Sequence, residues 1–283
     1  MERFVCVNGS DNLQIPQELL AALSQVTPEE FQRDAQAMIF VADKMETDGW
    51  VRLPFCNTLC SEALGAVPTL SMSGARVKEP PYRQAAELPE EVTVSTPRLE
   101  AMMQVLERLS GMEKQVAYNI EGPFSILCTL LPMNRVFATL RKPEGEAMLA
   151  RAEDWVMAYA ELVVSRGVKL LSFADPIATR DILGDRVFLN TYVPCLKRVL
   201  ARLQEKYPHV PVHLCGKLTQ SLLDTECCAL EIWNGEGCDT YGQVLEAFCR
   251  QEKGGLMGHF CLNFLGAKRP YIKLIHFKEE RSL

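Results

Sequence analysis

Apolar residues follow two alternating patterns along the chain, short continuous runs and longer runs with helical spacing. The short runs predict strands at 50–55, 115–119, 168–173, 210–214, 228–232 and 255–260. The helical spacing predicts helices at 28–42, 97–109, 144–165, 187–206, 218–223 and 241–251. Because strands and helices alternate, the pattern predicts parallel strands joined by helical crossovers.

Two local signals refine these helices. Thr27 precedes Pro28-Glu29-Glu30, an arrangement typical of a helix N-cap followed by an acidic first turn. Pro194 lies inside the helix predicted at 187–206, where its ring removes a backbone donor and should kink the helix.

The length and composition fit a single barrel domain over 1–283. The chain has 283 residues, 48% of them hydrophobic, close to the size of one (β/α)₈ TIM barrel. Residues 1–27 form an N-terminal segment without a clear pattern, and 73–97 is a proline-rich stretch expected to be a long irregular loop, disordered or functional. An open doubly wound sheet would show the same alternation, but no G-x-G-x-x-G opens a helix, which disfavours dinucleotide binding.

Charge and cysteine content narrow the function classes. The formal net charge of −6 argues against a nucleic acid partner. The chain shows neither a secretory signal nor an 18-residue apolar stretch, so we expect no membrane span and a cytoplasmic location. Its 11 cysteines should then be reduced, most as core thiols and a few as metal ligands or nucleophiles.

Polar side chains gather where four predicted strands end. In chain order they are Asn119 with Glu121, Asp175, His213 with Cys215, and His259 with Cys261. The carboxyl ends of barrel strands open on one face, which carries the active site. The pattern therefore predicts that these residues meet in one mouth.

His213 and Cys215 are the first candidates for metal ligands. Two residues apart on a strand, they face the same side, and zinc binds imidazole nitrogen and thiolate sulfur. A catalytic zinc needs a third protein ligand, for which Cys261 at a later strand end is the best candidate. Cys238 and the Cys227-Cys228 pair are alternatives, and the spacing alone leaves ordinary core packing open.

The two carboxylates at strand ends also allow two interpretations. Asp175 precedes Pro176, and Glu121 precedes Gly122-Pro123. Each carboxylate could cap a turn or helix. Each could instead lie in the mouth and exchange protons with a substrate.

Several segments in order resemble one family, the uroporphyrinogen decarboxylase superfamily, and within it the corrinoid-linked methyltransferases. The resemblance covers roughly residues 28–265. Its motifs are Leu53-Pro54-Phe55-Cys56, Glu62-Ala63-Leu64-Gly65-Ala66, Glu121-Gly122-Pro123-Phe124, Ser172-Phe173-Ala174-Asp175-Pro176 and His213-Leu214-Cys215-Gly216.

The resemblance implies a TIM barrel, here shortened at its N-terminus. It also implies a zinc ion bound by His213, Cys215 and a distant cysteine, which we expect to be Cys261. In such enzymes the zinc holds a thiol as its thiolate, which attacks a methyl group on a cobalt corrinoid.

Roles for the remaining candidates complete the expected site. Asp175 and Glu121 are expected to act in catalysis. Asn119, Cys56 and His259 are expected to bind substrate.

The predicted function is methyl transfer between a corrinoid, as methylcobalamin or on a carrier protein, and a small molecule. The acceptor could be a thiol, such as coenzyme M or homocysteine, or tetrahydrofolate. One alternative is a metal-free decarboxylase of a porphyrinogen-like acid, disfavoured because the arginine-rich signature of that branch has no counterpart before Thr27. Another is a barrel that binds a corrinoid without catalysis.

Overall fold

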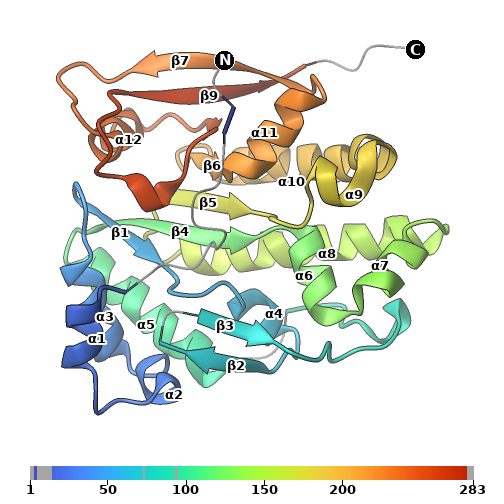
Figure 1. Cartoon of the computed structure of the whole chain (residues 1–283), viewed down its shortest axis with the longest axis horizontal. Coiled ribbons are helices and arrows are strands. Elements are labelled where there is room, and N and C mark those ends of the chain that lie inside the picture. Colours follow the sequence, from blue (N-terminus) through green and yellow to red (C-terminus); the bar gives the residue numbers. More distant parts are fainter. Residues whose placement is uncertain (1–2, 5–14, 73, 93–94, 279–283) are drawn as a thin grey trace.

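One large sheet organises the fold of the chain. The computed structural model describes residues 3–4, 15–72, 74–92 and 95–278. Within these residues the large sheet has the strand order β1-β4-β5-β6-β8-β9-β7 (Figure 1). Its strands are β1 (Trp50–Leu53), β4 (Gln115–Glu121), β5 (Leu170–Ala174), β6 (Val212–Leu214), β7 (Cys228–Asn234), β8 (Leu256–Gly258) and β9 (Tyr271–Phe277). A separate hairpin pairs β2 (Pro68–Ser71) with β3 (Gly74–Val77).

The first five strands of this order are parallel, as the alternating pattern predicts. They are rich in buried apolar residues, and every residue of β6 is buried. Such strands are typical of parallel sheets, whose two faces are both covered. The parallel α/β arrangement that the pattern predicts is therefore confirmed, and the carboxyl ends of these strands lie at one edge.

The last two strands depart from the expected repeat. β9 pairs with β8 and β7 pairs with β9, both antiparallel. The connection from β8 to β9 contains only a short 3₁₀ turn, Leu262–Phe264, and lacks the crossover helix that a parallel return needs. The strand expected at 228–232 therefore exists as β7, but it lies at the sheet edge and pairs antiparallel, outside the parallel series.

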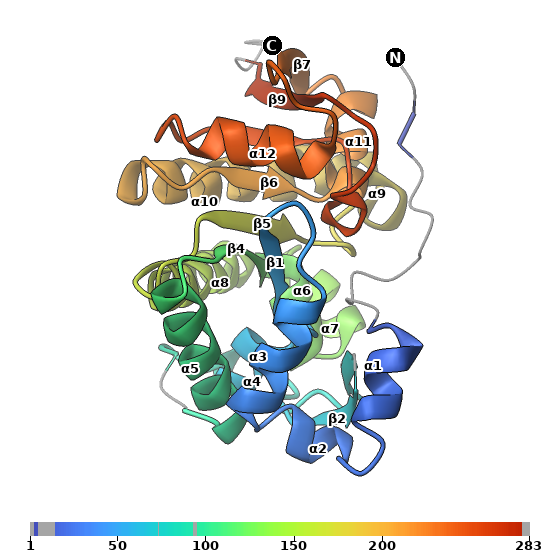
Figure 2. The same cartoon turned by 90° about the vertical axis from the view of Figure 1, so that its left-hand side faces the viewer.

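Helices cover the sheet and are spread over the whole chain (Figure 2). The α-helices are α1 (Gln17–Ala22), α2 (Pro28–Phe31), α3 (Ala35–Lys44), α4 (Leu59–Ala63), α5 (Pro97–Gly111), α6 (Pro123–Leu130), α7 (Met133–Thr139), α8 (Glu144–Val164), α9 (Arg180–Val187), α10 (Val193–Lys206), α11 (Gly216–Asp224) and α12 (Tyr241–Cys249). The helices α3 and α5 pack beside β1 and β4, and α8 packs against β4 and α10. None of the helices in the described ranges has the length and apolarity that a membrane crossing requires.

The predicted cap at Thr27 is confirmed, but the helix it starts is short. The Thr27 side chain and Glu30 form a reciprocal capping box. The helix α2 ends at Phe31, and α3 starts afresh with the Asp34 side chain accepting from two backbone N–H groups. The single helix expected over 28–42 is thus two helices.

A π-helical turn lies directly before the position of Pro194, where the sequence predicts a kink. A π-helical turn, Phe188–Tyr192, separates α9 from α10, and Pro194 lies in the first turn of α10. Proline cannot donate the usual backbone hydrogen bond, and a π turn is one way for the chain to absorb that loss. The turn buries Tyr192 beside Phe124, with ring centroids 5.2 Å apart.

The segment expected to be an irregular loop at 73–97 contains two short regular elements. Gly74–Val77 forms β3, and Ala85–Glu87 forms a 3₁₀ turn. The Tyr82 hydroxyl donates to the Leu64 carbonyl at 2.7 Å, which ties the segment to the end of α4. Residues 73 and 93–94 of this segment, like 1–2 and 5–14 of the N-terminal one, lie outside the described residues.

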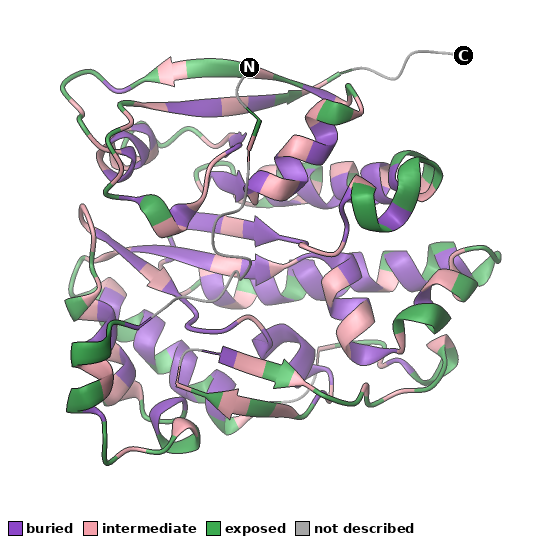
Figure 3. Cartoon of the chain, in the orientation of Figure 1, coloured by how far each residue is buried: buried purple, intermediate pink, exposed green. Residues whose placement is uncertain are grey.

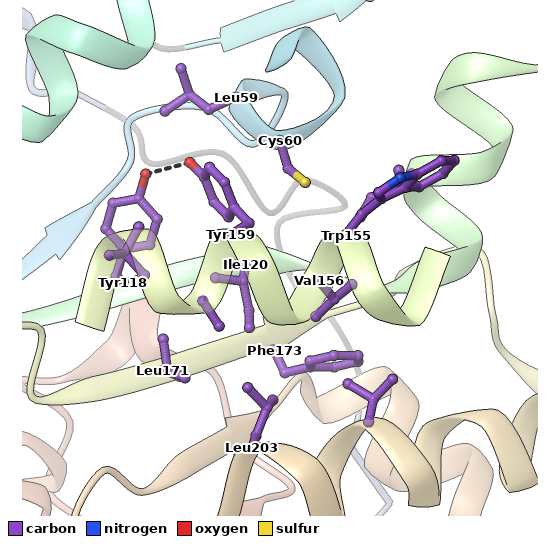
Figure 4. Close-up of a cluster of buried hydrophobic side chains, with 14 of the residues drawn as sticks. Leu59, Cys60, Tyr118, Ile120, Trp155, Val156, Tyr159, Leu171, Phe173 and Leu203 are labelled. Carbon is purple, nitrogen blue, oxygen red and sulfur yellow. Dashed lines mark hydrogen bonds between the residues drawn. The ribbon is translucent and has the colours of Figure 1, made fainter. Parts of the chain in front are cut away.

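The main core lies between the sheet and its helices (Figure 3). Figure 4 shows part of it, where Tyr159 of α8 lies beside Tyr118 of β4, and Val156 of α8 lies beside Phe173 of β5. The buried hydroxyls of Tyr118 and Tyr159 satisfy each other at 2.7 Å.

Side chains connect β1 with the C-terminal part of the chain. Among the described residues no hydrogen-bonded ladder joins β1 to β7, so the sheet is open there. Instead, Trp50 Nε1 donates to the Gly242 carbonyl at 2.9 Å. Arg52 Nη1 donates to Asn263 Oδ1 at 2.9 Å, which places the segment after β8 against β1.

Candidate functional site

A small cavity, the first cavity, opens at the carboxyl ends of the parallel strands. Its volume is about 70 Å³. Its walls come from strand ends, from the segment after β8 and from the N-terminal residue Phe4. The lining residues with polar or sulfur-containing side chains are Arg52, Asn119, Ser172, His213, Cys215, Cys261 and Asn263. The three expected metal ligands and Asn119 therefore line one cavity.

His213 of β6 is buried and makes one side-chain hydrogen bond. Its Nε2 lies 2.9 Å from the Tyr241 hydroxyl. Its Nδ1 is buried without a hydrogen-bond partner among the described residues. Burial lowers the pKa of His213 to about 4, so the imidazole is neutral at pH 7. A neutral imidazole is the form that binds metals.

The two thiols of the first cavity come from different elements. Cys215 lies between β6 and α11, and its backbone N–H donates to Phe173, which fixes β6 beside β5. Cys261 lies directly before the 3₁₀ turn that follows β8. The next residue after Cys215 is Gly216, and the Phe4 ring occupies the space that a Cβ there would need. Glycine thus lets Phe4 cover this wall.

The donor chemistry of the first cavity fits zinc, although its geometry is incomplete. The cavity offers two thiols and one imidazole whose Nδ1 has no hydrogen-bond partner in the described part of the chain, and these are ligand types that zinc prefers. Within the described part of the chain, however, no three histidine, cysteine or acidic residues are close enough to hold a metal. Ligation by all three side chains would therefore need an arrangement of His213, Cys215 and Cys261 that differs from the observed one.

The alternative third ligands lie elsewhere. Cys228 is the first residue of β7 and Cys227 directly precedes it, and Cys238 lies in the turn after this strand. None of them lines the first cavity. Of the cysteines that the sequence left open, the structure brings only Cys261 to the cavity of His213.

Asn119 contributes an unsatisfied acceptor to the first cavity. It points from β4, and its Oδ1 is buried with no hydrogen-bond partner among the described residues. Leaving a buried polar atom unpaired costs about 1–3 kcal/mol. A ligand donor that pairs with this oxygen would recover that cost.

A second cavity adjoins the first, because Ala174 lines both. Its volume is about 420 Å³. The residues with polar side chains on its walls are Asn57, Thr58, Arg76, Glu121, Ser125, Cys128 and Thr129. It is large enough for a small organic molecule, whereas the first cavity admits only a small group.

Glu121 of β4 belongs to the second cavity and not to the first. Burial raises its pKa to about 8, although the Ser61 hydroxyl donates to its Oε2 at 3.2 Å and favours the charged form. At pH 7 the carboxyl group therefore holds its proton. A neutral acid beside a cavity can donate a hydrogen bond or a proton.

Asp175 is fully buried and caps a helix. Its carboxylate accepts from the backbone N–H groups of Phe124 and Ser125 at 3.1 and 2.8 Å, and from the Ser125 hydroxyl. These contacts hold the start of α6, and burial raises the pKa of Asp175 to about 6. Gly122 lies against this carboxylate so closely that a Cβ would overlap it. Of the two interpretations open from the sequence, the observed contacts are those of a cap.

Cys56 and His259 line neither cavity. Cys56 is buried against Arg98, its thiol donates to Gln32 Oε1 at 3.0 Å, and burial raises its pKa to about 11. His259 is buried between Lys273, 2.8 Å from its Nδ1, and Gln220, 3.1 Å from its Nε2. The structure therefore separates both from Asn119, the third residue expected to bind substrate.

Two features of the site had no signal in the sequence. Tyr241, the partner of His213, is simply the first residue of an apolar helix. The ion pair of Glu62 and Arg98, which supports the loop after β1, joins residues 36 apart. Glu62 fell within a family motif, but nothing in the pattern pointed to its partner.

Comparisons with known proteins agree with this fold. Residues 18–268 match the uroporphyrinogen decarboxylase (URO-D) family. The methylcobamide:CoM methyltransferase MtaA of Methanosarcina barkeri is 24% identical over 192 residues, which is 64% of this chain and 55% of that protein. MtbA of Methanosarcina mazei, also a methylcobamide:CoM methyltransferase, is 26% identical over 135 residues, 46% of this chain and 40% of that protein.

A solved structure shows the same fold. A methyltransferase from Methanosarcina mazei superposes with a TM-score of 0.63 at 19% identity, covering 80% of this chain and 68% of that one. The chain spans little more than half the length of the first of these curated relatives. The match to the family covers most of the chain, and the chain therefore belongs to the uroporphyrinogen decarboxylase family, on the branch that includes the corrinoid methyltransferases.

Proposed function

We propose that this protein is a zinc-dependent methyltransferase that moves a methyl group between a corrinoid and a small acceptor. The observation that carries the proposal is the meeting of His213, Cys215 and Cys261 in one cavity at the carboxyl ends of the strands. This is the place where barrel enzymes carry their active sites. The methyltransferases among its relatives support the same conclusion.

Zinc, held by His213, Cys215 and Cys261, would supply one kind of chemistry: it keeps a bound thiol deprotonated while its sulfur stays nucleophilic. The chain's own residues would do the rest. The Asn119 oxygen, which has no hydrogen-bond partner among the described residues, would orient a donor group of the acceptor. Phe4 would exclude water from the wall beside Gly216.

The carboxyl groups would act at the second cavity. Glu121 would hold a proton there and donate a hydrogen bond to the acceptor. Asp175 would act through α6, whose start it fixes, and α6 in turn contributes Ser125 and Cys128 to the cavity wall. We therefore assign Asp175 a positioning role.

The volumes of the two cavities favour a small acceptor. The first cavity, about 70 Å³, cannot enclose a corrinoid ring, so the corrinoid must present its methyl group at the mouth. A carrier protein that docks there would serve this purpose. The acceptor, a thiol or a folate, would approach from the second cavity, which shares Ala174 with the first.

The zinc content of purified variants tests the proposal. Wild type is expected to hold about one zinc ion per chain, and Cys215→Ala and Cys261→Ala are expected to hold little. Cys238→Ala is the matched control, because Cys238 does not line the first cavity. Circular dichroism should show that all three variants keep their fold, since a site at a barrel mouth adds little to core packing.

The other outcomes have distinct meanings. Zinc retained by Cys261→Ala but lost by Cys238→Ala would move the third ligand to the turn after β7. Zinc absent from folded wild type would refute the proposal and favour the metal-free decarboxylase or a corrinoid-binding barrel without catalysis. With zinc present, transfer from methylcobalamin to coenzyme M, homocysteine and tetrahydrofolate identifies the acceptor.

A further inference from the structure

Tyr241 is the only side-chain hydrogen-bond partner that the described residues offer to the His213 ring, through Nε2. We propose that Tyr241 is a positioning residue that accepts the Nε2–H proton of His213 and thereby leaves Nδ1 as the nitrogen that binds zinc. This inference rests on the proposed function, and it names the residue that fixes which nitrogen of His213 is free to bind zinc.

The hydrogen bond decides which nitrogen is available. A neutral imidazole carries one proton, and a partner on one nitrogen fixes the tautomer. Nε2 is 2.9 Å from the Tyr241 hydroxyl, while Nδ1 is buried without a partner among the described residues. If Nε2 carries the proton, Nδ1 presents a lone pair.

Tyr241 is rigid enough to serve as such a partner. It is fully buried at the start of α12, where its backbone N–H donates to the Ala267 carbonyl at 3.0 Å. Its ring meets Phe260 edge-on at 4.6 Å between centroids. The Arg269 guanidinium covers Phe260 at 4.0 Å from the ring centroid. These contacts give the hydroxyl one position, facing His213.

The arrangement also connects the two sides of the expected zinc site. Phe260, which packs on Tyr241, directly precedes Cys261 and lines the first cavity. Tyr241 thus contacts one expected ligand by its hydroxyl and the neighbour of another by its ring. Partners that orient a metal-binding histidine typically contribute 10–100-fold to metal affinity.

Zinc affinity of Tyr241→Phe, measured by competition with a chelator of known affinity, tests the inference. The variant removes only the hydroxyl, and its affinity is expected to fall by about 10–100-fold. Tyr118→Phe is the matched control: it also removes a buried, hydrogen-bonded hydroxyl, the one paired with Tyr159 in Figure 4, and should bind zinc as wild type does.

A second measurement does not depend on zinc or on a variant. Nitrogen-15 correlation spectra of the metal-free wild type report the tautomer of each imidazole, and the chain has only four histidines. His213 is expected to carry its proton on Nε2.

The outcomes separate the two proposals. A zinc-binding wild type with unchanged affinity in Tyr241→Phe would overturn the inference and leave the proposed function standing. A proton on Nδ1 of His213 would overturn it as well. A folded wild type without zinc affinity would refute the proposed function, and this role of Tyr241 with it.

Discussion

Arg98 and Glu62 form an ion pair inside the protein, and its removal should show how the loop after β1 is held. Both side chains are almost fully buried, with 5% and 6% of their surface exposed. The Thr58 hydroxyl donates to Glu62 Oε1 at 2.6 Å, and Arg98 Nη1 lies 3.0 Å from the same hydroxyl. Arg98 also contacts Cys56. The pair therefore joins α5, α4 and the loop between β1 and α4.

We predict that Arg98→Met lowers the free energy of unfolding by about 3–5 kcal/mol, the usual cost of leaving a buried charge without its partner. Burial raises the pKa of Glu62 even though Arg98 favours the charged form. The free energy lost when the Glu62 carboxylate is dehydrated therefore exceeds the free energy gained when it pairs with Arg98. Consequently the double variant Arg98→Met/Glu62→Leu should be more stable than Arg98→Met alone, because it buries no unpaired charge.

Urea unfolding followed by circular dichroism, in both single variants and the double variant, measures these differences. The control replaces Arg202, whose ion pair with Asp154 is exposed and should contribute far less. A decrease in the free energy of unfolding of less than about 1 kcal/mol in Arg98→Met would refute the reasoning, since a buried carboxylate without a partner destabilises the fold by more than that. A double variant less stable than Arg98→Met would contradict the prediction, and a double variant less stable than wild type would show that the pair contributes more than its burial costs.

Three further predictions follow from the site. The folded-state pKa of Glu121 is raised from 4.5 to about 8, so between these values the folded protein binds a proton that the unfolded chain releases. The stability of the fold should therefore fall as pH rises from about 4.5 through 8. Melting temperatures at the two ends of this pH range should differ less in Glu121→Gln than in wild type. Asp175→Asn should lose about 1–2 kcal/mol of cap stabilisation and speed amide exchange at Phe124 and Ser125, while zinc content stays the same; unchanged exchange would contradict the cap. Cys215→Ala should lose zinc and methyl transfer but keep its circular dichroism spectrum, and an unfolded variant would mean that the metal is structural.

The parallel part of the fold could be predicted because its signals are local. The apolar runs that became β4, β5 and β6 are bounded by turn residues, and the helices between them have regular spacing. The position of β7 could not be predicted, because strand order depends on the connection between β8 and β9 and on pairing between distant segments. The division of the helix after Thr27 needed the cap at Asp34, which lies inside an otherwise continuous apolar pattern.

The candidate site was predictable to the extent that strand ends define it. His213, Cys215, Cys261 and Asn119 line one cavity because the ends of parallel strands share one edge. Cys56 follows β1 closely in the sequence, but its side chain contacts Arg98 instead of the cavity. No pattern in the sequence shows this contact. Hydrogen-bond partners far apart in the chain, such as the one at His213, follow only from the fold.

The contact between Gly122 and Asp175 has a consequence for how the family can vary. Gly122 has φ −80°, a backbone conformation open to any residue, so the conformation does not demand glycine. The demand comes from Asp175, whose carboxylate fills the space of a Cβ. Positions 122 and 175 should therefore vary together among related sequences. A relative with a smaller residue in place of the aspartate can have alanine at 122, whereas a relative that keeps the aspartate cannot.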